Sequence, residues 1–576
     1  MRKIITLSIF LLFACASFSQ DLPHKITDNE KLQMPFYVNS IKSQNGTMGV
    51  NPPSSPVRTI GEWEELQGLL IAWTSYQSML REIVRAAKQE TRVYILSANP
   101  TSVINYLSAG GVDTVNVSVI NIPFNSVWCR DYGPWSAYTN DVDTLITIDW
   151  IYNRPRPLDD AVPVGIAAQL GTPLYETTTS PNNLIHTGGN FMTDGFGTGF
   201  SSELITNENP TKTKSEIDTI MKKFMGITRY INFPVLPYDA IHHIDMHMKL
   251  LDEETLLVGQ YPTGVADGPQ IEANLTYITT NFNSVYGTPY NVVRIPMPDD
   301  NGAYPNTTGD YFTYTNSSFI NKTLIVPTYN IPEDSVALQI YRDALPGYNV
   351  VGINSLSSIP ALGALHCITK ELGTDDPLLI SHQRLRDTYN TTSPYLVIAL
   401  MKHRTGIQNA TLFWRADTTQ PYQQVTMTPL IGQNNQFAGA IPPQAAGTNI
   451  YYYVQANAVS GKQQVRPLPA PQGYWKFKIL GAVGLNESND NVFELKNIYP
   501  NPCNAITCVP VNMSSEQDIS VKIKDVAGRN VRQIYRGTTK AGINNFFFNA
   551  SLLAKGAYII EVVSEKNTAM QKIIVR

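Results

Sequence analysis

The sequence is poor in cysteine for its length. Its 576 residues include five, at positions 15, 129, 367, 503 and 508. No two of them form the C-x-x-C pair that is typical of structural zinc sites, and five thiols are too few for a disulfide framework. A lone cysteine in the body of a chain, such as Cys367, is either a buried spectator or a nucleophile. The rest of the sequence has to distinguish these two roles.

Charge of either sign is not in excess, and long apolar runs are missing. Forty-three Lys and Arg against 47 Asp and Glu give a net charge of −4, so no basic footprint indicates a nucleic-acid partner. After the first twenty residues no stretch is long and apolar enough for a transmembrane helix. No acidic run resembles a calcium loop. We therefore expect no nucleic acid, no transmembrane segment, no metal and no cofactor.

The first residues read "MRKIITLSIFLLFACASFSQ". A basic start, a short apolar stretch and a small-x-small site at Ser17 to Ser19 predict a signal peptide over 1–19. Residues 20–50 are polar and lack periodicity, so they are interpreted as a pro-segment or a disordered lead. We expect an exported protein.

The spacing of apolar residues and the composition change twice along the body of the chain. From 51 to 390 apolar strand-like runs alternate with helical spacing, which indicates an α/β domain. Residues 391–480 carry short alternating strands divided by Gly, Pro, Asn and Gln, which favours an immunoglobulin-like β-sandwich. Residues 481–492 read as a polar linker, and 493–576 as a second all-β domain.

The last domain resembles a known family. Its segments "YPNP", "DVAGR", "LAKGAYIIEV" and "KIIVR" are similar to the C-terminal sorting domain of the bacterial type IX secretion system. The resemblance implies the type IX machinery as a partner and a secreted or outer-surface location. Cys503 and Cys508 lie five residues apart there, and the sequence does not establish whether they form a disulfide.

Polar residues in apolar surroundings mark a candidate site in the α/β domain. His243 and Asp245 in "HHID" are two apart, so on a strand they would share a face. A thiol such as Cys367 becomes a good nucleophile beside a cation, and a histidine can pass a proton to the leaving group. By itself the H-x-D pattern favours a metal-binding or structural pair.

A second segment, "WCRDYGPW", supplies the carboxylate of Asp131 between Trp128 and Trp135. Aromatic faces beside a carboxylate favour a flat cation, and a guanidinium matches carboxylates in a bidentate manner. The competing interpretation is a buried pair between Arg130 and Asp131. The glycine-rich "TGGNFMTDGFG" lacks the lysine of a phosphate loop and is interpreted as tight turns near the site.

Together "WCRDYGP", "TGGNFMTDG", "HHID" and "GALHC", in this order, resemble the guanidine-modifying deiminases, over roughly residues 55–390. The resemblance implies a pseudo-fivefold α/β propeller of ββαβ units. It also implies roles for five residues: Cys367 as nucleophile, His243 as general acid and base, Asp131 and Asp245 as carboxylates for the guanidinium, and Asn316 beside the thiol. The implied reaction is hydrolysis of a guanidinium to a ureido group and ammonia through a covalent thiouronium.

The segment "YNRPRP" bears on the substrate. Arg154 and Arg156, two apart on an extended stretch, suit a substrate carboxylate, although a solvated basic loop paired with Asp159 and Asp160 is an equal alternative. With the export signal and the β-domains, the segment resembles the secreted bacterial peptidyl-arginine deiminases. That resemblance implies recognition of a C-terminal arginine by the two arginines, with Trp128 lining the pocket.

The predicted function is therefore deimination of peptidyl arginine, preferably C-terminal, to citrulline. The alternatives are agmatine deiminase, a non-catalytic surface binding protein on this scaffold, and a thiol protease. We expect His366 to point away from Cys367 on a strand and to have no role. Cys129 and His242 are expected to be packing residues.

Overall fold

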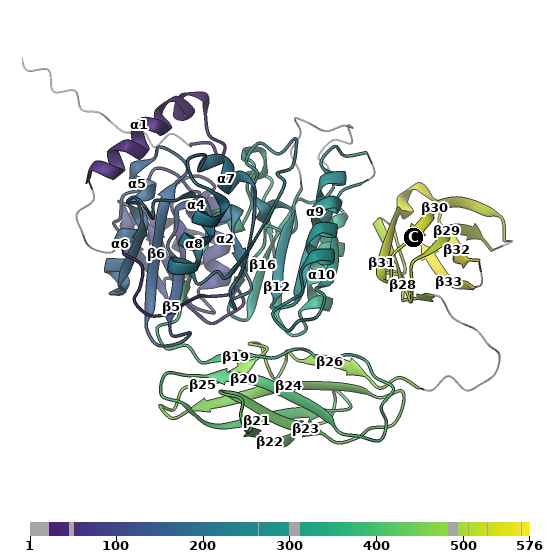
Figure 1. The fold of residues 1–576 in the computed structure, drawn as a ribbon. Helices are drawn as coiled ribbons and strands as arrows, with labels where there is room; N and C mark the ends of the chain where they lie inside the picture. The colour runs from purple at the N-terminus through teal and green to yellow at the C-terminus, as the bar shows by residue number, and fades with distance from the viewer. Residues whose placement is uncertain are drawn as a thin grey trace, which may run out of the picture.

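The structure is a computed structural model and describes residues 22–44, 51–262, 264–298, 312–481, 493–504, 506–526, 528–565 and 567–576. The expected signal peptide and most of the expected linker lie outside these residues. Within them, no helix has both the length and the apolarity needed to cross a membrane. Figure 1 shows an α/β part, an elongated β part beneath it and a second β part to one side.

The described strands of the α/β part form five small sheets. They are β18 (Lys370–Gly373), β2 (Leu66–Ala72), β3 (Arg92–Leu96) and β4 (Val117–Ile120); β1 (Val57–Thr59), β5 (Trp135–Thr139), β6 (Leu145–Tyr152) and β7 (Leu174–Thr177), with β8 (Ile185–His186); β9 (Met192–Thr193), β10 (Thr198–Ser202) and β11 (Arg229–Phe233); β12 (Met248–Asp252), β13 (Thr255–Gln260) and β14 (Asn291–Pro296); and β15 (Ser318–Ile320), β16 (Thr323–Thr328) and β17 (Asn349–Asn354).

The helices of this part connect and cover the sheets. They are α2 (Gln77–Ala87), α3 (Pro100–Ala109), α4 (Cys129–Tyr132), α5 (Pro157–Asp160), α6 (Val162–Leu170), α7 (Leu204–Glu208), α8 (Lys214–Met225), α9 (Gly268–Asn281) and α10 (Glu333–Ala344), with the 3₁₀ turns η1 (Gly188–Asn190), η2 (Ile244–Met246), η3 (Ile359–Ala361) and η4 (His366–Ile368). Each longer helix buries one apolar stripe, as Leu80, Ile83 and Ala87 of α2 illustrate.

One pairing scheme recurs in all five sheets. The middle strand β13 is antiparallel to β12 and, after helix α9, parallel to β14. The same scheme centres on β2, β6, β10 and β16. In the sheet of β2 the antiparallel partner is β18, from the far end of the α/β part. The residues just before β18 are thereby placed beside the beginning of that part.

Two all-β parts follow. The first contains β19 (Leu379–Ser381), β20 (Tyr395–Lys402), β21 (Ile407–Arg415), β22 (Gln423–Pro429), β23 (Gln436–Ile441), β24 (Asn449–Ala458), β25 (Gln463–Arg466) and β26 (Trp475–Lys478). These strands pair antiparallel throughout around their own core. That they form an immunoglobulin-like module stays a prediction.

The second all-β part also has its own core. Two sheets enclose it, built from β27 (Phe493–Leu495), β28 (Ile506–Met513) and β31 (Gly542–Asn549), and from β30 (Asn530–Thr539), β29 (Gln517–Asp525), β32 (Gly556–Ser564) and β33 (Thr568–Val575), with the short turn η5 (Ala550–Leu552). Cys503 and Cys508 are both free thiols and buried.

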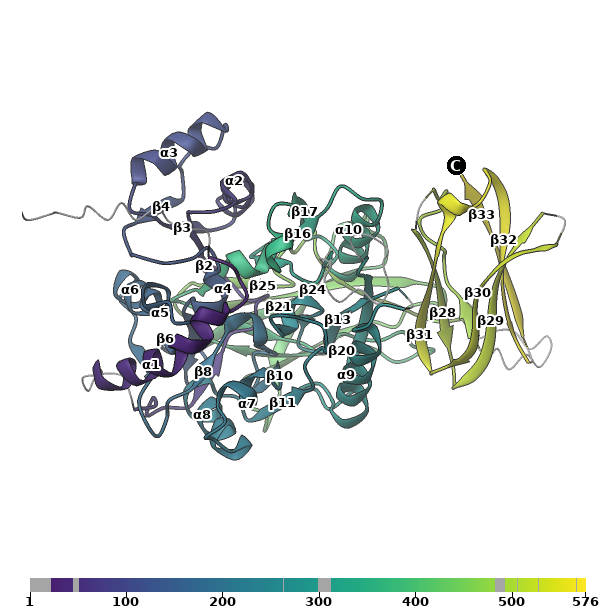
Figure 2. The same cartoon turned by 90° about the horizontal axis from the view of Figure 1, so that it is seen from above.

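The segment before the α/β part departs from one expectation. Residues 20–50 were expected to be a pro-segment or a disordered lead, but Asp28–Gln44 form helix α1. The helix lies across the α/β part near α4, α5 and β6 (Figure 2). Its first turn is fixed by a capping box, in which Thr27 and Glu30 exchange backbone and side-chain hydrogen bonds of 2.9 and 3.2 Å. Disorder is therefore the wrong description of residues 22–44.

Candidate active site

The five residues expected to carry chemistry meet at turns beside the strand ends. Asp131 lies on the single turn α4, and His243 and Asp245 lie at η2. Asn316 lies just before β15, and Cys367 lies on η4, just before β18. All five are buried. Residues separated by up to 236 positions therefore share one site because the sheets gather their connecting turns around a common centre.

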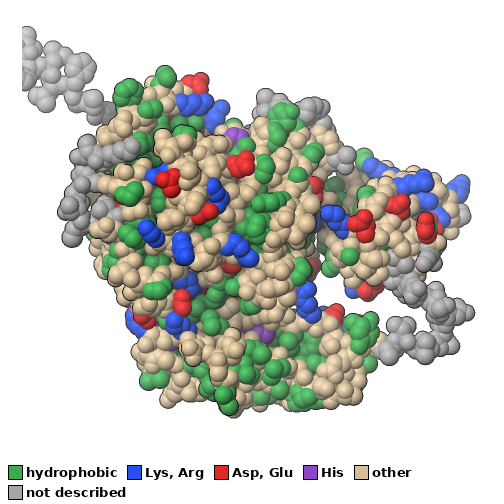
Figure 3. Space-filling view, in the orientation of Figure 1, with side chains coloured by type: hydrophobic (Ala, Val, Ile, Leu, Met, Phe, Trp, Pro, Cys, Tyr) green, Lys and Arg blue, Asp and Glu red, His purple; other side chains and the backbone are tan. Residues whose placement is uncertain are grey.

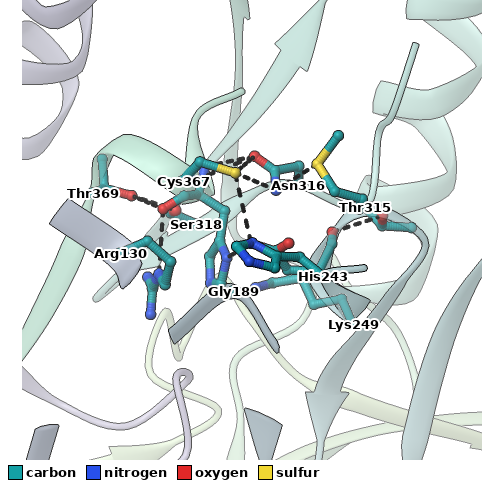
Figure 4. Close-up of polar contacts among 12 residues, drawn as sticks. Arg130, Gly189, His243, Lys249, Thr315, Asn316, Ser318, Cys367 and Thr369 are labelled. Carbon is teal, nitrogen blue, oxygen red and sulfur yellow. Dashed lines mark hydrogen bonds and ion pairs between the residues drawn. The ribbon is translucent and has the colours of Figure 1, made fainter. Parts of the chain in front are cut away.

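Asn316 and Asp245 surround the thiol of Cys367. The Asn316 Nδ2 lies 3.2 Å from the Cys367 Sγ, and the nearest Asp245 carboxylate oxygen lies 3.8 Å from it. The Asn316 Oδ1 accepts the backbone N–H of His366 at 3.0 Å, which fixes the amide. Figure 4 shows the sulfur directed toward Asn316, with His243 beneath it.

The closed site opposes ionisation of the thiol. Burial raises the pKa of Cys367 well above its ordinary value, and the carboxylates of Asp245 and Asp131 raise it further. A cation placed between the thiol and these carboxylates would act in the opposite direction. The site is thus suited to a nucleophile that ionises when a cationic ligand is bound.

His243 is buried with its ring beside Asp131. Its Nδ1 lies 3.6 Å from the Asp131 Oδ1, and its Nε2 lies 3.4 Å from the Thr187 hydroxyl. Burial lowers the pKa of His243 to about 4 despite the nearby carboxylates. Burial alone would raise the pKa of Asp131, but the two histidines beside it, His243 and His24, hold that pKa below its ordinary value.

The glycine pair of "TGGN" makes room for this arrangement, as expected for tight turns. A Cβ on Gly189 would lie 2.4 Å from the His243 Nδ1, and one on Gly188 would lie 1.9 Å from the carbonyl oxygen of Arg130. Gly189 also donates its backbone N–H to Asp131 at 3.2 Å. A side chain at position 188 would collide with the main chain, and one at position 189 would displace the ring of His243.

His366 corrects one expectation. It lies on a 3₁₀ turn and not on a strand, so it does not point away from the site. Its Nδ1 is 2.7 Å from the Asp245 carboxylate and its Nε2 is 2.8 Å from Glu62. Asp245 is therefore held on one side by His366 and faces Cys367 on the other. The adjacency of His366 to Cys367 was visible in the sequence, but the turn was not.

The expected alternative of a buried pair between Arg130 and Asp131 is wrong. The Arg130 guanidinium pairs with Glu371 at 2.7 Å and donates from Nε to the His366 carbonyl at 3.2 Å. On the one-turn helix α4 the two neighbouring side chains diverge. Asp131 is left to face the site.

That Cys129 and His242 serve only in packing stays a prediction. Cys129 is buried against the Leu70 carbonyl, and burial raises its pKa. His242 lies outside η2, and its backbone carbonyl accepts a hydrogen bond from Ser202.

Arg154 and Arg156 are buried and do not form a solvated loop. Asp159 instead accepts hydrogen bonds from Ser126, and Asp160 bonds with Tyr37. The pairing with these two aspartates offered by the alternative interpretation is therefore wrong.

The two arginines bind the segment that precedes the α/β part. Arg154 donates from Nε and Nη2 to the carbonyl of His24 at 3.2 and 3.1 Å. Arg156 donates to the carbonyl of Pro23 at 2.7 Å and pairs with Glu30 at 2.7 Å. Both arginines therefore donate hydrogen bonds to main-chain oxygens of the chain's own N-terminal segment, which lies in the site.

The side chain of His24 fills the space beside Asp131. It is fully buried, its Nε2 is 2.7 Å from the Asp131 Oδ2 and its Nδ1 is 2.8 Å from the Leu362 carbonyl. Its ring stacks on Trp128 with 4.2 Å between centroids and 10° between planes. Trp128 in turn donates its indole N–H to the Leu22 carbonyl at 2.9 Å.

His24 is the site residue that the sequence reasoning missed. The histidine itself carries no signal, since it stands alone in a polar stretch. The pattern T-x-x-E at Thr27 to Glu30 is a capping-box signature and could have indicated an ordered helix directly after it.

Among the residues that the structure describes, one set of side chains could hold a metal. The ligand atoms of His24, Asp131 and His243 lie within 4.8 Å of one another. However, both ring nitrogens of His24 already lie at hydrogen-bond distance from oxygens that accept. We read the cluster as hydrogen-bonded, and the absence of a metal requirement stays a prediction.

Sequence relatives match the α/β part. A Vibrio parahaemolyticus protein named "Putative agmatine deiminase" is 23% identical over 351 residues, covering 54% of this chain and 95% of its own. A Legionella pneumophila protein of the same name is 25% identical over 267 residues, covering 44% and 75%.

Solved structures match as well. A Porphyromonas gingivalis structure described as a "Putative Arginine Deiminase" is 20% identical with a TM-score of 0.50, covering 55% of this chain and 99% of its own. A further structure, described as a "putative agmatine deiminase", is 19% identical with a TM-score of 0.51, covering 57% and 100%. At these identities the likeness shows the fold.

A family model that matches more than half of the chain defines the α/β part as a deiminase domain of the guanidine-modifying type. The family model described as "Porphyromonas-type peptidyl-arginine deiminase" matches residues 58–372, and the chain belongs to this family. A second model, "Secretion system C-terminal sorting domain", matches residues 497–576. The chain therefore carries a type IX sorting domain, which indicates secretion to the outer surface or the extracellular space.

Proposed function

We propose that this protein converts peptidyl arginine, preferably at a C-terminus, to citrulline and ammonia. The observation that carries the proposal is the way His24 is held. A planar ring lies on Trp128 and against Asp131, while the carbonyl of the same residue is bound by Arg154. A C-terminal arginine would present a guanidinium to the first two groups and a carboxylate to the third.

The chemistry follows from the groups around that slot. The guanidinium cation lies between the carboxylates and favours the thiolate of Cys367, which attacks the guanidinium carbon. His243 takes the proton that the thiol loses and delivers it to one nitrogen as the bond from carbon to that nitrogen breaks, so ammonia departs and a covalent thiouronium remains on Cys367. Water, deprotonated by His243, adds to the same carbon, and the carbon–sulfur bond breaks. The oxygen of that water becomes the ureido oxygen, and the thiolate is restored.

Asp131, Asp245 and Asn316 are assigned supporting roles. The two carboxylates hold the cation in position, and Asn316 orients the sulfur through its contact at 3.2 Å. The five small sheets of the α/β part share one pairing scheme around a middle strand, and we propose that they are the blades of a pseudo-fivefold propeller. The site would then lie at its centre.

Agmatine is the competing substrate, because the relatives carry that name. Agmatine has the guanidinium but no carboxylate, so it would offer Arg154 no oxygen in place of the carbonyl of His24. The preceding carbonyl, which Arg156 binds at Pro23, also has no counterpart in agmatine. Both contacts favour a peptide.

Arg154→Ala tests the substrate assignment. Wild type should have a higher kcat/KM for a peptide ending in arginine than for the same peptide amidated. In Arg154→Ala the ratio of these two values should fall toward one, because Arg154 binds the terminal carboxylate. Arg156→Ala should weaken both peptides alike. The ratio of kcat/KM values is the measurement, and an unchanged ratio in Arg154→Ala would sink the assignment.

A further inference from the structure

The segment 22–44 has the contacts of a bound substrate. The side chain of His24 lies in the slot between Trp128 and Asp131. The carbonyls of Pro23 and His24 accept hydrogen bonds from Arg156 and Arg154, respectively. The indole of Trp128 holds the Leu22 carbonyl. Three consecutive residues therefore bind through main-chain oxygens, in the manner of an extended peptide.

The hydrogen bonds of His24 make it a cation. The Leu362 carbonyl and the Asp131 carboxylate can only accept, so both ring nitrogens must donate. A ring that donates from both nitrogens is the protonated imidazolium. It is planar, positively charged and stacked on an indole, as a guanidinium would be.

Helix α1 anchors the segment from the other side. Glu30 pairs with Arg156 at 2.7 Å, and the Tyr37 hydroxyl donates to Asp160 at 2.7 Å. Both contacts join α1 to the turn that carries the substrate-binding arginines. The helix therefore keeps His24 at a high effective concentration over the site.

We propose that residues 22–44 are an intramolecular inhibitor, with His24 as a pseudosubstrate residue in the guanidinium slot. The inference rests on the proposed function, since the slot is the one assigned to arginine. A histidine there has no carbon that Cys367 can attack with loss of ammonia. The segment therefore blocks the site without being consumed. Activity requires its removal or displacement.

The first test compares three full-length proteins, namely wild type, His24→Ala and Lys25→Ala. Two rates are measured on each: alkylation of Cys367 by iodoacetamide, followed by peptide mass mapping, and citrulline formation from a peptide ending in arginine. His24→Ala removes a buried charge-assisted bond, so both rates should rise by about tenfold or more. Lys25 is exposed, and its variant should match wild type.

The two readouts separate the two hypotheses. Equal alkylation rates in all three proteins would overturn the inhibitor. Citrulline formation that is measurable and equal in wild type and His24→Ala would overturn it as well, while leaving the proposed function in place. Faster alkylation in His24→Ala without any citrulline would support the inhibitor and sink the proposed function.

A second variant keeps the site filled. His24→Arg places a guanidinium in the same slot, so the chain should convert position 24 to citrulline, with one nitrogen replaced by the oxygen of water. Peptide mapping detects the change, and it should be independent of protein concentration. The double variant with Cys367→Ala should stay unmodified. An unmodified position 24 in a preparation that converts free peptide would overturn the pseudosubstrate assignment.

Discussion

At the scale of residues, the site depends on glycines, which leave room for neighbouring side chains, as much as on its polar residues. Gly189 leaves the space that the His243 ring occupies, since a Cβ there would lie 2.4 Å from its Nδ1. Gly189→Ala should displace His243 and lower kcat by about a hundredfold while the protein still folds. Gly268→Ala is the matched control, because that position meets nothing closer than 3.5 Å. Equal kcat values in the two variants would contradict this reading.

Charge around the thiol leads to a pH prediction. Burial raises the pKa of Cys367, and the Asp245 carboxylate is the first charge that raises it further. Asp245→Asn removes that charge, so the thiolate becomes easier to form and the pKa of Cys367 falls. The pH profile of Cys367 alkylation, measured in the His24→Ala protein, should shift to lower pH. A shift to higher pH would show that Asp245 does not act through its charge.

Individual residues were more predictable than their conformations. Motifs in the sequence were enough to name five site residues, and the structure brings them together. They are Asp131, His243, Asp245, Asn316 and Cys367. The expectation of strands at "HHID" and "LHC" was wrong, since both are 3₁₀ turns. Alternating apolar spacing reports burial and does not report such short turns. His24 was beyond reach because its partners lie 107 and 338 positions away.

At the scale of elements, the capping box of α1 links local helix stability to access to the site. Thr27→Ala removes the side-chain acceptor for the Glu30 N–H and should cost about 1 kcal/mol of helix stability. We expect faster amide hydrogen exchange across α1 and faster alkylation of Cys367. Thr213→Ala, which removes the similar box of α8, is the control and should leave Cys367 unaffected.

The alternation of strands and helices was predictable from the sequence. The pairing of the last strand of the α/β part with a strand near its beginning was not. The pairing of β18 with β2 joins residues about 300 positions apart, and no local pattern indicates it. This pairing places Cys367 beside the other turns of the site.

At the scale of the whole molecule, the first all-β part is attached to the α/β part by Arg466. Its buried guanidinium donates to the Trp63 carbonyl at 2.9 Å and lies 3.6 Å from Glu253. Arg466→Ala would leave Glu253 buried without this partner and should lower the free energy of unfolding by about 2 kcal/mol or more. Lys462→Ala, which breaks the more exposed pair with Glu65, should cost less than about 1 kcal/mol. Urea unfolding of both variants measures the difference.

Charges of both signs are mixed on one face of the molecule. On the face shown in Figure 3, basic and acidic side chains are interspersed over the α/β part without a patch of one sign. This agrees with the net charge of −4. Charge complementarity is concentrated in the buried site instead, where Asp131 and Arg154 meet the two ends of a single residue.

The most direct test of the proposed reaction is citrulline formation by the full-length His24→Ala protein on three substrates. They are a short peptide ending in arginine, the same peptide amidated, and agmatine, with the His24→Ala, Cys367→Ala double variant as control. We expect rapid turnover of the free-carboxylate peptide, slower turnover of the amide, and none in the control. Turnover of agmatine alone would contradict the substrate assignment, and turnover that survives the loss of Cys367 would contradict the mechanism.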